Sequence, residues 1–466
     1  MIGAIDRIEI ADGVTADLYL LRFDKDGRLK SPQTAELFLE AARQASDVFL
    51  FSHGWNNTYD IALRAYRGFI KGYVRQRRDL GLPLPPDYRP VLLGIIWPAT
   101  SFVLPWESGP DIAAGDGTAQ SLVDEEMLTF VTDSLPHDDE AALTELVDGR
   151  QALSRGDAAR AADIVLGALW ADEGSDVRLP RPTAEDFLLS WQALDEATNG
   201  PVVLGGEDDF GSLEDDFGGL DPEATPGVDE QVGSGPVDDG PLVAGGLSLD
   251  PRNLLRAATV WKMKARAGRV GAAGVGPLLR AVLGEPQPPR VHMVGHSFGA
   301  RVVLSAVASG DLPAPVRSML LLQPAVNRWC FAPQVPGLGA PGGYHPVLER
   351  VTNPILTTFS NRDLPLHEVF HLAVRGSSLG EPDIAAVGNT DLYGALGGYG
   401  PAGLDGLAVT VPAVAPGSQR YRSSTARVIA IDGGAVLDGA AAIGAHSDIS
   451  NPVTYWALHS ATSPEG

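Results

Sequence analysis

The sequence predicts an α/β protein with a mostly parallel central sheet that carries helices on both faces. Short apolar strands alternate with helical segments in the first 97 residues and again after residue 251. The strands at 48–52 and 91–97 are nearly continuous apolar runs, as expected for strands buried on both faces. A G-x-S-x-G run at 295–299 lies between a predicted strand and a predicted helix, which is typical of an enzyme built on such a sheet.

The N-terminal elements follow from local patterns. Residues 2–10 and 15–23 are separated by Asp12-Gly13 and predict a β-hairpin. Ser31-Pro32 is typical of an N-cap followed by the first helical residue, so a helix is expected to run from there to about residue 45. Residues 59–78 have helical spacing between the strands at 48–52 and 91–97.

The alternation stops after Trp97, and residues 100–250 are predicted to be a large insertion or cap. Helical segments are expected at 140–169 and 183–198. Residues 205–240 are acidic and rich in Gly and Pro, a composition that predicts disorder. The predicted organisation is therefore an N-terminal core part (1–99), the insertion (100–250) and a C-terminal core part (251–466).

Regular structure is expected to resume at 251. A helix is predicted over 252–283, with its basic residues on the solvated face. The glycines at 271, 274 and 276 follow no predicted strand and do not indicate a phosphate-binding loop. Four strands are predicted in the C-terminal part, at 290–295, 318–323, 354–360 and 426–431.

The composition excludes some classes of function. The 466 residues carry a formal net charge of −24, which disfavours nucleic acid as a partner. A single cysteine, Cys330, excludes an internal disulfide and a cysteine-based metal cluster, and its neighbours Trp329 and Phe331 predict a buried packing residue. The sequence shows no signal-peptide pattern and no apolar stretch of transmembrane length, so a cytoplasmic protein is expected.

Ser297, in the run Gly295-His296-Ser297-Phe298-Gly299, is the predicted nucleophile. A tight turn from strand to helix leaves no room for side chains two residues before and after the serine, so both positions require glycine. The turn lifts the hydroxyl above the sheet and directs the N–H groups of the following helix toward the reacting oxygen.

A serine nucleophile needs a base, and the base needs an orienting acid, in the chain order Ser, Asp or Glu, His. Asp363 follows the strand at 354–360 and is the predicted acid, with Asp383 and Asp391 as weaker candidates. Asp363 has an alternative interpretation as a helix N-cap. His446 follows the last predicted strand and is the predicted base; His459 is the other downstream histidine.

Backbone N–H donors must also meet the negatively charged oxygen of the transition state. Phe298 follows the nucleophile and is one expected donor; Trp55, after the strand at 48–52, is the other. His53, Gly54 and His296 are expected to line the substrate-binding site.

These motifs together resemble the α/β-hydrolase superfamily over roughly residues 1–100 and 251–460. The run Phe51-Ser52-His53-Gly54-Trp55-Asn56-Asn57, the Trp97-Pro98 strand end and the run around Ser297 look like a bacterial esterase/lipase-like branch. The resemblance implies an α/β-hydrolase fold and a Ser–Asp–His mechanism on a small-molecule acyl substrate, without metal or cofactor. The long insertion between Gly54 and Ser297 departs from the compact pattern and leaves the cap undefined.

Two alternatives remain open at this stage. His367, Glu368 and His371 form an H-E-x-x-H match, which on a helix can bind zinc in a metallopeptidase; His345 and His446 are possible third ligands. The other alternative is a non-catalytic binding protein on a hydrolase scaffold, whose acidic segment recruits an unknown partner.

Overall fold

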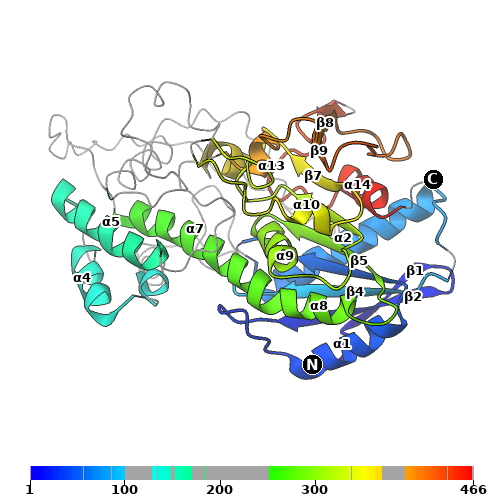
Figure 1. Ribbon diagram of the computed structural model, residues 1–466, viewed down its shortest axis with the longest axis horizontal. Helices are drawn as coiled ribbons and strands as arrows, with labels where there is room; N and C mark the ends of the chain where they lie inside the picture. The colour runs from blue at the N-terminus through cyan, green and yellow to red at the C-terminus, as the bar shows by residue number, and fades with distance from the viewer. Residues whose placement is uncertain are drawn as a thin grey trace, which may run out of the picture.

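The protein forms an α/β fold around one large, mostly parallel sheet (Figure 1). The computed structural model describes residues 2–55, 57–85, 87–99, 128–133, 135–147, 153–170, 184, 251–336, 338–369, 394–437 and 439–463. The predicted helix at 183–198 lies outside these residues except for residue 184, and so does the whole acidic segment at 205–240.

Nine strands form the sheet, in the order β1-β2-β4-β3-β5-β6-β7-β9-β8. The strands are β1 (Asp6–Ala11), β2 (Val14–Arg22), β3 (Asp47–Ser52), β4 (Pro90–Ile96), β5 (Arg290–His296), β6 (Ser318–Leu322), β7 (Ile355–Phe359), β8 (Ala408–Pro412) and β9 (Val428–Asp432). Only β1 and β2 pair antiparallel, and every other pair in this sheet is parallel. Because β3 pairs with β5, the strands before residue 100 and after residue 250 belong to one sheet.

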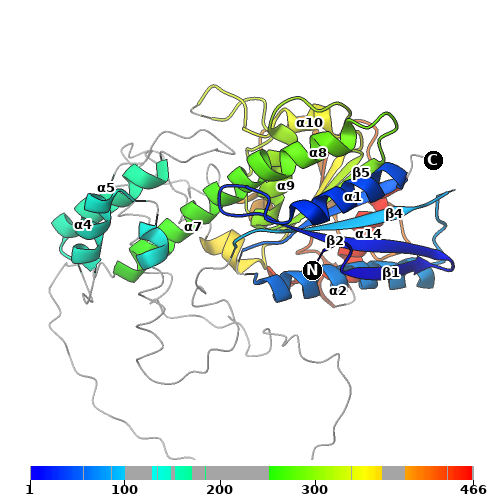
Figure 2. The ribbon, with the colours of Figure 1, turned by 90° about the horizontal axis from the view of Figure 1, so that it is seen from below.

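Helices cover both faces of the sheet. One face is packed by α1 (Pro32–Gln44), α8 (Gly276–Leu283) and α9 (Phe298–Ala308), and the other by α2 (Tyr59–Asp79) and α14 (Pro452–Thr462) (Figure 2). Side chains of β3 alternate between two separate cores: Val48 and Leu50 belong to the first, and Phe49 and Phe51 to the second. The strands therefore bury both faces, as their apolar runs predict.

The N-terminal predictions and the four C-terminal strand predictions are confirmed, with small shifts at the ends. The predicted helix at 140–169 is instead two helices, α4 (His137–Val147) and α5 (Arg155–Trp170). Helix α5 packs against α7 (Pro251–Arg269) and α4 packs against α5, to one side of the sheet in Figures 1 and 2.

The predicted helix at 252–283 consists of α7, the π-helical segment η1 (Val270–Val275) and α8. Its glycines allow close packing. A Cβ on Gly271 would lie 2.3 Å from the carbonyl oxygen of Val302 in α9, and one on Gly274 would lie 2.6 Å from the carbonyl oxygen of Gly27. Side chains at these positions would push η1 away from its neighbours, which explains the glycines without a phosphate site.

The basic residues of α7 correct the prediction of a solvated face. Lys262, Lys264 and Arg266 are buried. The Lys262 ammonium group pairs with Asp133, and the Arg266 guanidinium donates to the carbonyl oxygen of Pro98 and lies over the ring of Phe130. The helical period predicts this helix correctly, but α5 and the residues around 130 cover the face that its charges assigned to solvent.

Several elements near the C-terminus were not predicted. These are β8, the short pair β10 (Val436–Leu437) and β11 (Ala440–Ala441), the one-turn helices α10 (Val347–Arg350) and α13 (Leu396–Tyr399), and α14. Helix α14 is buried on nearly all sides, so it lacks the one-sided apolar stripe that identifies a surface helix. Among the described helices, none combines the length and the apolar character needed to cross a membrane.

Candidate active site

Ser297 occupies a sharp turn between β5 and α9. Its backbone has φ 54° and ψ −126°, a conformation that non-glycine residues rarely adopt. The N–H of Ser297 donates to the carbonyl oxygen of Leu322, and its own carbonyl accepts from Ala300 and Ala325. These three bonds hold the strained residue in place, and retained strain of this kind is concentrated at functional sites.

The two glycines of the motif are required by close backbone contacts. A Cβ on Gly295 would lie 2.6 Å from Cα of Ala300, where α9 folds back over β5. A Cβ on Gly299 would lie 2.2 Å from the carbonyl oxygen of Ser52 at the end of β3. The turn can therefore form only because neither position carries a side chain.

Ser297, His446 and Asp363 form a continuous chain of hydrogen bonds. The Ser297 hydroxyl lies 2.9 Å from Nε2 of His446, and Nδ1 of His446 lies 2.7 Å from Oδ2 of Asp363. Asp363 is completely buried and its carboxylate can only accept, so Nδ1 of His446 carries the proton and Nε2 is free to accept from the serine. This tautomer is the one that a general base needs.

Asp363 makes the hydrogen bonds that both interpretations of the sequence require. It follows β7, and its Oδ1 accepts from the N–H of Leu366 in η2 (Pro365–Val369) while Oδ2 accepts from His446. The alternative acids Asp383 and Asp391 lie outside the described residues. The alternative base His459 lies within α14, buried against Trp456, and is therefore not at a loose chain end.

Gln323, which the sequence did not single out, connects the acid to the loop of the base. Its Nε2 lies 3.3 Å from Oδ2 of Asp363 and 2.7 Å from the carbonyl oxygen of Ala445. The residue is completely buried and has φ 40°, and its backbone N–H donates to the hydroxyl of Thr358. Two acceptors at Nε2 determine the orientation of the amide. The sequence feature that could have identified Gln323 is its position as a polar residue directly after β6.

His296 holds the same loop from the other side. Its Nε2 donates to the carbonyl oxygen of His446 at 3.0 Å, and the two imidazole rings lie 4.9 Å apart. Burial, with a smaller contribution from repulsion by His446, lowers the pKa of His296 to about 3. His296 is therefore neutral at pH 7 and acts on His446 through this hydrogen bond. Contact of His296 with substrate stays a prediction.

The loop after β3 approaches the serine through Gly54. A Cβ on Gly54 would lie 2.7 Å from Cβ of Ser297. His53 is buried, with its ring stacked on Trp97 at 5.4 Å; its Nδ1 donates to the carbonyl oxygen of Gly54 and its Nε2 accepts from the N–H of Trp97. Burial lowers the pKa of His53 to about 4. Both ring nitrogens thus hold protein groups, and His53 fixes this loop in position.

Trp55 and Phe298, the two residues expected to supply oxyanion donors, have neighbouring side chains. Phe298 is the first residue of α9, where a helix leaves its N–H groups without intrahelical partners. The rings of Trp55 and Phe298 lie 6.1 Å apart. The contact between Gly54 and Ser297 brings the backbone of residues 53–55 to the same place. Donation by the N–H groups of Trp55 and Phe298 to an oxyanion stays a prediction.

Among the described residues, a second hydrogen-bonded series of Ser, His and Asp lies at the amino ends of the central strands, away from Ser297. Ser318 lies 2.8 Å from Nδ1 of His292, whose Nε2 lies 3.0 Å from Oδ1 of Asp47. All three are buried, and Arg290 pairs with the same carboxylate. Ser318 is the first residue of β6 and pairs with His292 near the start of β5. It therefore lacks the turn between strand and helix that exposes a nucleophile.

The H-E-x-x-H match is only partly described. His367 lies in η2 with its ring stacked on that of Tyr399, while His371 and the side chain of Glu368 lie outside the described residues. Within the residues that were searched, no group of three or more His, Cys, Asp or Glu side chains is arranged to hold a metal ion. The zinc alternative at His367 and His371 is therefore not tested by the described residues.

Ser297, His446 and Asp363 together can carry out nucleophilic acyl transfer. The serine can transfer its proton to Nε2 of His446, and the buried carboxylate stabilises the imidazolium that results. Comparison of the chain with protein-family models, with curated proteins and with solved structures finds no match.

Proposed function

We propose that the protein is a serine hydrolase that cleaves a carboxylic ester or a related acyl bond. The observation that carries the proposal is the hydrogen-bond chain from Asp363 through His446 to Ser297, on a strained turn between a strand and a helix. A structural serine needs neither a positive φ nor a correctly protonated imidazole, so the combination favours catalysis.

The order of the elements supports the α/β-hydrolase type of fold. The serine follows β5, the acid follows β7 and the histidine follows β9, at the carboxyl ends of parallel strands. Ligands of open α/β sheets bind at this edge, and the chain order Ser, Asp, His is that of α/β-hydrolases. The same arrangement makes a single acyl-binding site beside Ser297 the natural location of the substrate.

In the proposed mechanism His446 removes the proton of the Ser297 hydroxyl as the oxygen attacks the carbonyl carbon. The N–H groups of Phe298 and Trp55 stabilise the oxyanion of the tetrahedral intermediate. The imidazolium of His446 then protonates the leaving group, which leaves an acyl-enzyme. Water attacks the acyl-enzyme with His446 again as base, and the acid is released with Ser297 restored. Asp363 keeps the imidazole in its tautomer throughout.

Labelling with a fluorophosphonate tests this proposal without knowledge of the substrate. Intact mass spectrometry of the wild type should show one covalent adduct, which peptide mapping places on Ser297. The variant Ser297→Ala should show none. Ser318→Ala is the matched control because it removes a serine hydroxyl that also lies against a histidine bonded to an aspartate, and it should label like the wild type.

A folded wild type that forms no adduct would contradict an activated Ser297. An adduct that persists in Ser297→Ala would move the nucleophile elsewhere in the chain. Far-ultraviolet circular dichroism of each variant establishes that it is folded, so that a lost adduct reports chemistry.

A further inference from the structure

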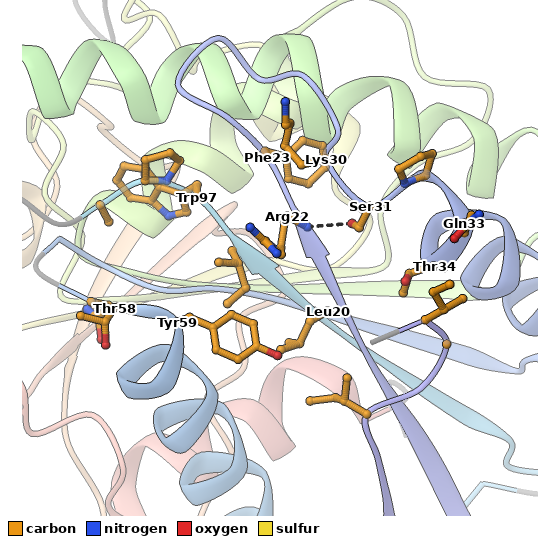
Figure 3. Close-up of a pocket in the computed structure, with 18 residues that line it drawn as sticks. Leu20, Arg22, Phe23, Lys30, Ser31, Gln33, Thr34, Thr58, Tyr59 and Trp97 are labelled. Atoms are coloured by element: carbon orange, nitrogen blue, oxygen red, sulfur yellow. Dashed lines mark hydrogen bonds between the residues drawn. The ribbon is translucent and has the colours of Figure 1, made fainter. Parts of the chain in front are cut away.

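A cavity separate from Ser297 lies between the start of α1 and the carboxyl ends of β2 and β4 (Figure 3). Its volume is about 700 Å³, within the range of small-molecule sites. Trp97 lines it, and the ring of His53, stacked on Trp97, belongs to the loop that contacts Ser297. The His53–Trp97 pair thus connects the wall of the cavity to the loop that contacts the serine.

We propose that this cavity binds an organic anion with an apolar body, such as a medium-chain carboxylate. The proposal is independent of the hydrolase activity proposed above. Arg22 and Lys30 line the cavity, and none of its described lining residues is Asp or Glu. In a chain of net charge −24, a cavity with two cations and no carboxylate selects for negative charge.

The two cations are available to a ligand. Neither Arg22 nor Lys30 forms an ion pair with any described residue, whereas Arg7, Arg28 and Arg67 do. Both side chains are exposed, and the charge of Lys30 also acts on the nearby carboxylate of Asp24. In Figure 3 the guanidinium of Arg22 points into the space among the labelled residues, whereas the ammonium group of Lys30 points away from Arg22. A cation that is already paired within the protein would offer little to a carboxylate, so Arg22 and Lys30 are better placed to bind one than the paired arginines nearby.

The N-terminus of α1 faces the cavity without a cap. The hydroxyl of Ser31, at the N-cap, accepts from the N–H of Arg22 at 3.0 Å and makes no capping bond to the helix. Pro32 has no N–H, and no acidic residue lies in the first turn. Gln33 and Thr34 therefore present unbonded N–H groups where the positive end of the helix dipole favours an anion.

Thr34 is a second and independent indication of a ligand. It lines the cavity, only 4% of it is exposed, and within the described structure its hydroxyl has no hydrogen-bond partner. A hydroxyl that lines the cavity without a protein partner, on a side chain that is otherwise buried, is available to bond to a ligand there. A carboxylate oxygen at the start of α1 would accept from Thr34 and from the helix N–H groups together.

The apolar side chains that line the rest of the cavity are the reason for proposing a ligand with an apolar body. Leu20, Ile96 and Trp97 form its floor, and Ile2 and Tyr59 lie at its rim with 65% and 40% of their surface exposed. Large apolar side chains at the rim of a cavity are suited to an alkyl chain or ring that extends outward from the anionic group. A small inorganic anion would leave this surface in water.

Isothermal titration calorimetry tests the site, with octanoate as the probe and the Ser297→Ala variant as the protein, so that binding is independent of catalysis. Octanoate should bind with one site per chain, at least about 10-fold more tightly than 1-octanol or acetate, because only octanoate offers both charge and an apolar body. Equal binding of octanoate and 1-octanol, or no binding of octanoate, would overturn the proposal.

Matched variants locate the site. Arg22→Gln combined with Lys30→Gln should weaken octanoate binding about 10-fold or more, and Thr34→Val should weaken it severalfold while keeping the side-chain shape. Arg64→Gln combined with Lys71→Gln makes the same change of charge on the exposed side of α2 and should leave binding unchanged. If both double variants weaken binding equally, the effect is one of net charge and the assigned site is wrong.

Discussion

At the scale of single residues, Gln323 adds further hydrogen bonds to the group formed by Ser297, His446 and Asp363. Its amide donates to both Asp363 and the carbonyl oxygen of Ala445, the residue before His446. The acid and the backbone of the base are thus held by one side chain. We infer that Gln323 is a positioning residue, because it acts on Ser297 only through these two groups.

Replacement of Gln323 should slow the reaction of Ser297 with a fluorophosphonate. We expect Gln323→Leu to lower the second-order labelling rate about 10–100-fold, because small displacements of a catalytic group cost this much. Gln323→Glu should be slower still, since it places a second carboxylate beside Asp363. A purely structural role predicts the reverse order, because Glu is nearly isosteric with Gln and Leu is not.

Asp363 can be tested without disturbing the helical turn that it caps. Asp363→Asn keeps an oxygen that can accept from Leu366, but its amide can no longer stabilise the proton on Nδ1 of His446. The labelling rate should fall by roughly 10³–10⁴-fold while the melting temperature changes little. A labelling rate close to that of the wild type would exclude Asp363 as the orienting acid.

At the scale of elements, the packing of α9 against the end of β3 creates the site. Gly299 lies where α9 crosses the backbone of Ser52 and His53, with no room for a Cβ atom. Gly68, in the middle of α2, has open space around it. The two glycines therefore allow a matched comparison.

We expect Gly299→Ala to lower the free energy of unfolding by about 3 kcal/mol, because the backbone of α9 or β3 must move. Gly68→Ala should raise it by about 0.5–1 kcal/mol, as alanine is favoured in a helix interior. Urea denaturation followed by circular dichroism measures both values. A Gly299→Ala variant as stable as the wild type would show that α9 does not approach β3 this closely.

At the scale of the whole molecule, buried histidines make stability depend on pH. Burial lowers the pKa of His53 and His459 to about 4 and that of His296 to about 3, from an ordinary value near 6.5. Below about pH 6.5 the unfolded chain binds protons at these positions and the native protein does not. The stability that these histidines contribute is therefore complete above pH 6.5 and is lost progressively toward pH 4.

Asp47 also makes the protein less stable as the pH falls, but in a lower pH range than the histidines. Burial alone would raise the pKa of this carboxyl, but hydrogen bonds from His292 and Arg290 lower it below its ordinary value. Its contribution is present above about pH 4 and is lost as the pH falls further.

The urea midpoint should consequently fall between pH 7 and pH 4.5. One pKa unit corresponds to about 1.4 kcal/mol, so His53 alone contributes roughly 3 kcal/mol to this loss by pH 4. His53→Gln removes one titrating group, so the urea midpoint of this variant should depend less steeply on pH. The variant should also be less stable than the wild type at pH 7. An unchanged dependence in this variant would mean that His53 is not buried in its neutral form.

The sequence by itself determined the types of most elements and the location of the serine. Strand and helix periods are local properties, and the glycines around Ser297 reflect a turn formed within five residues. The chain order of acid and base restricted Asp363 and His446 to short segments after two strands. These inferences need only neighbours along the chain.

Only the tertiary structure decided which distant groups meet. Gln323 contacts residues 40 and 122 positions away, and the burial of Lys262 depends on residues near 130. Helix α14 is buried on nearly all sides, and the cavity beside Arg22 and Lys30 exists because β2 and β4 are neighbours. The order of strands in the sheet and the packing of helices create these contacts, and neither produces a periodic pattern of residues in the sequence.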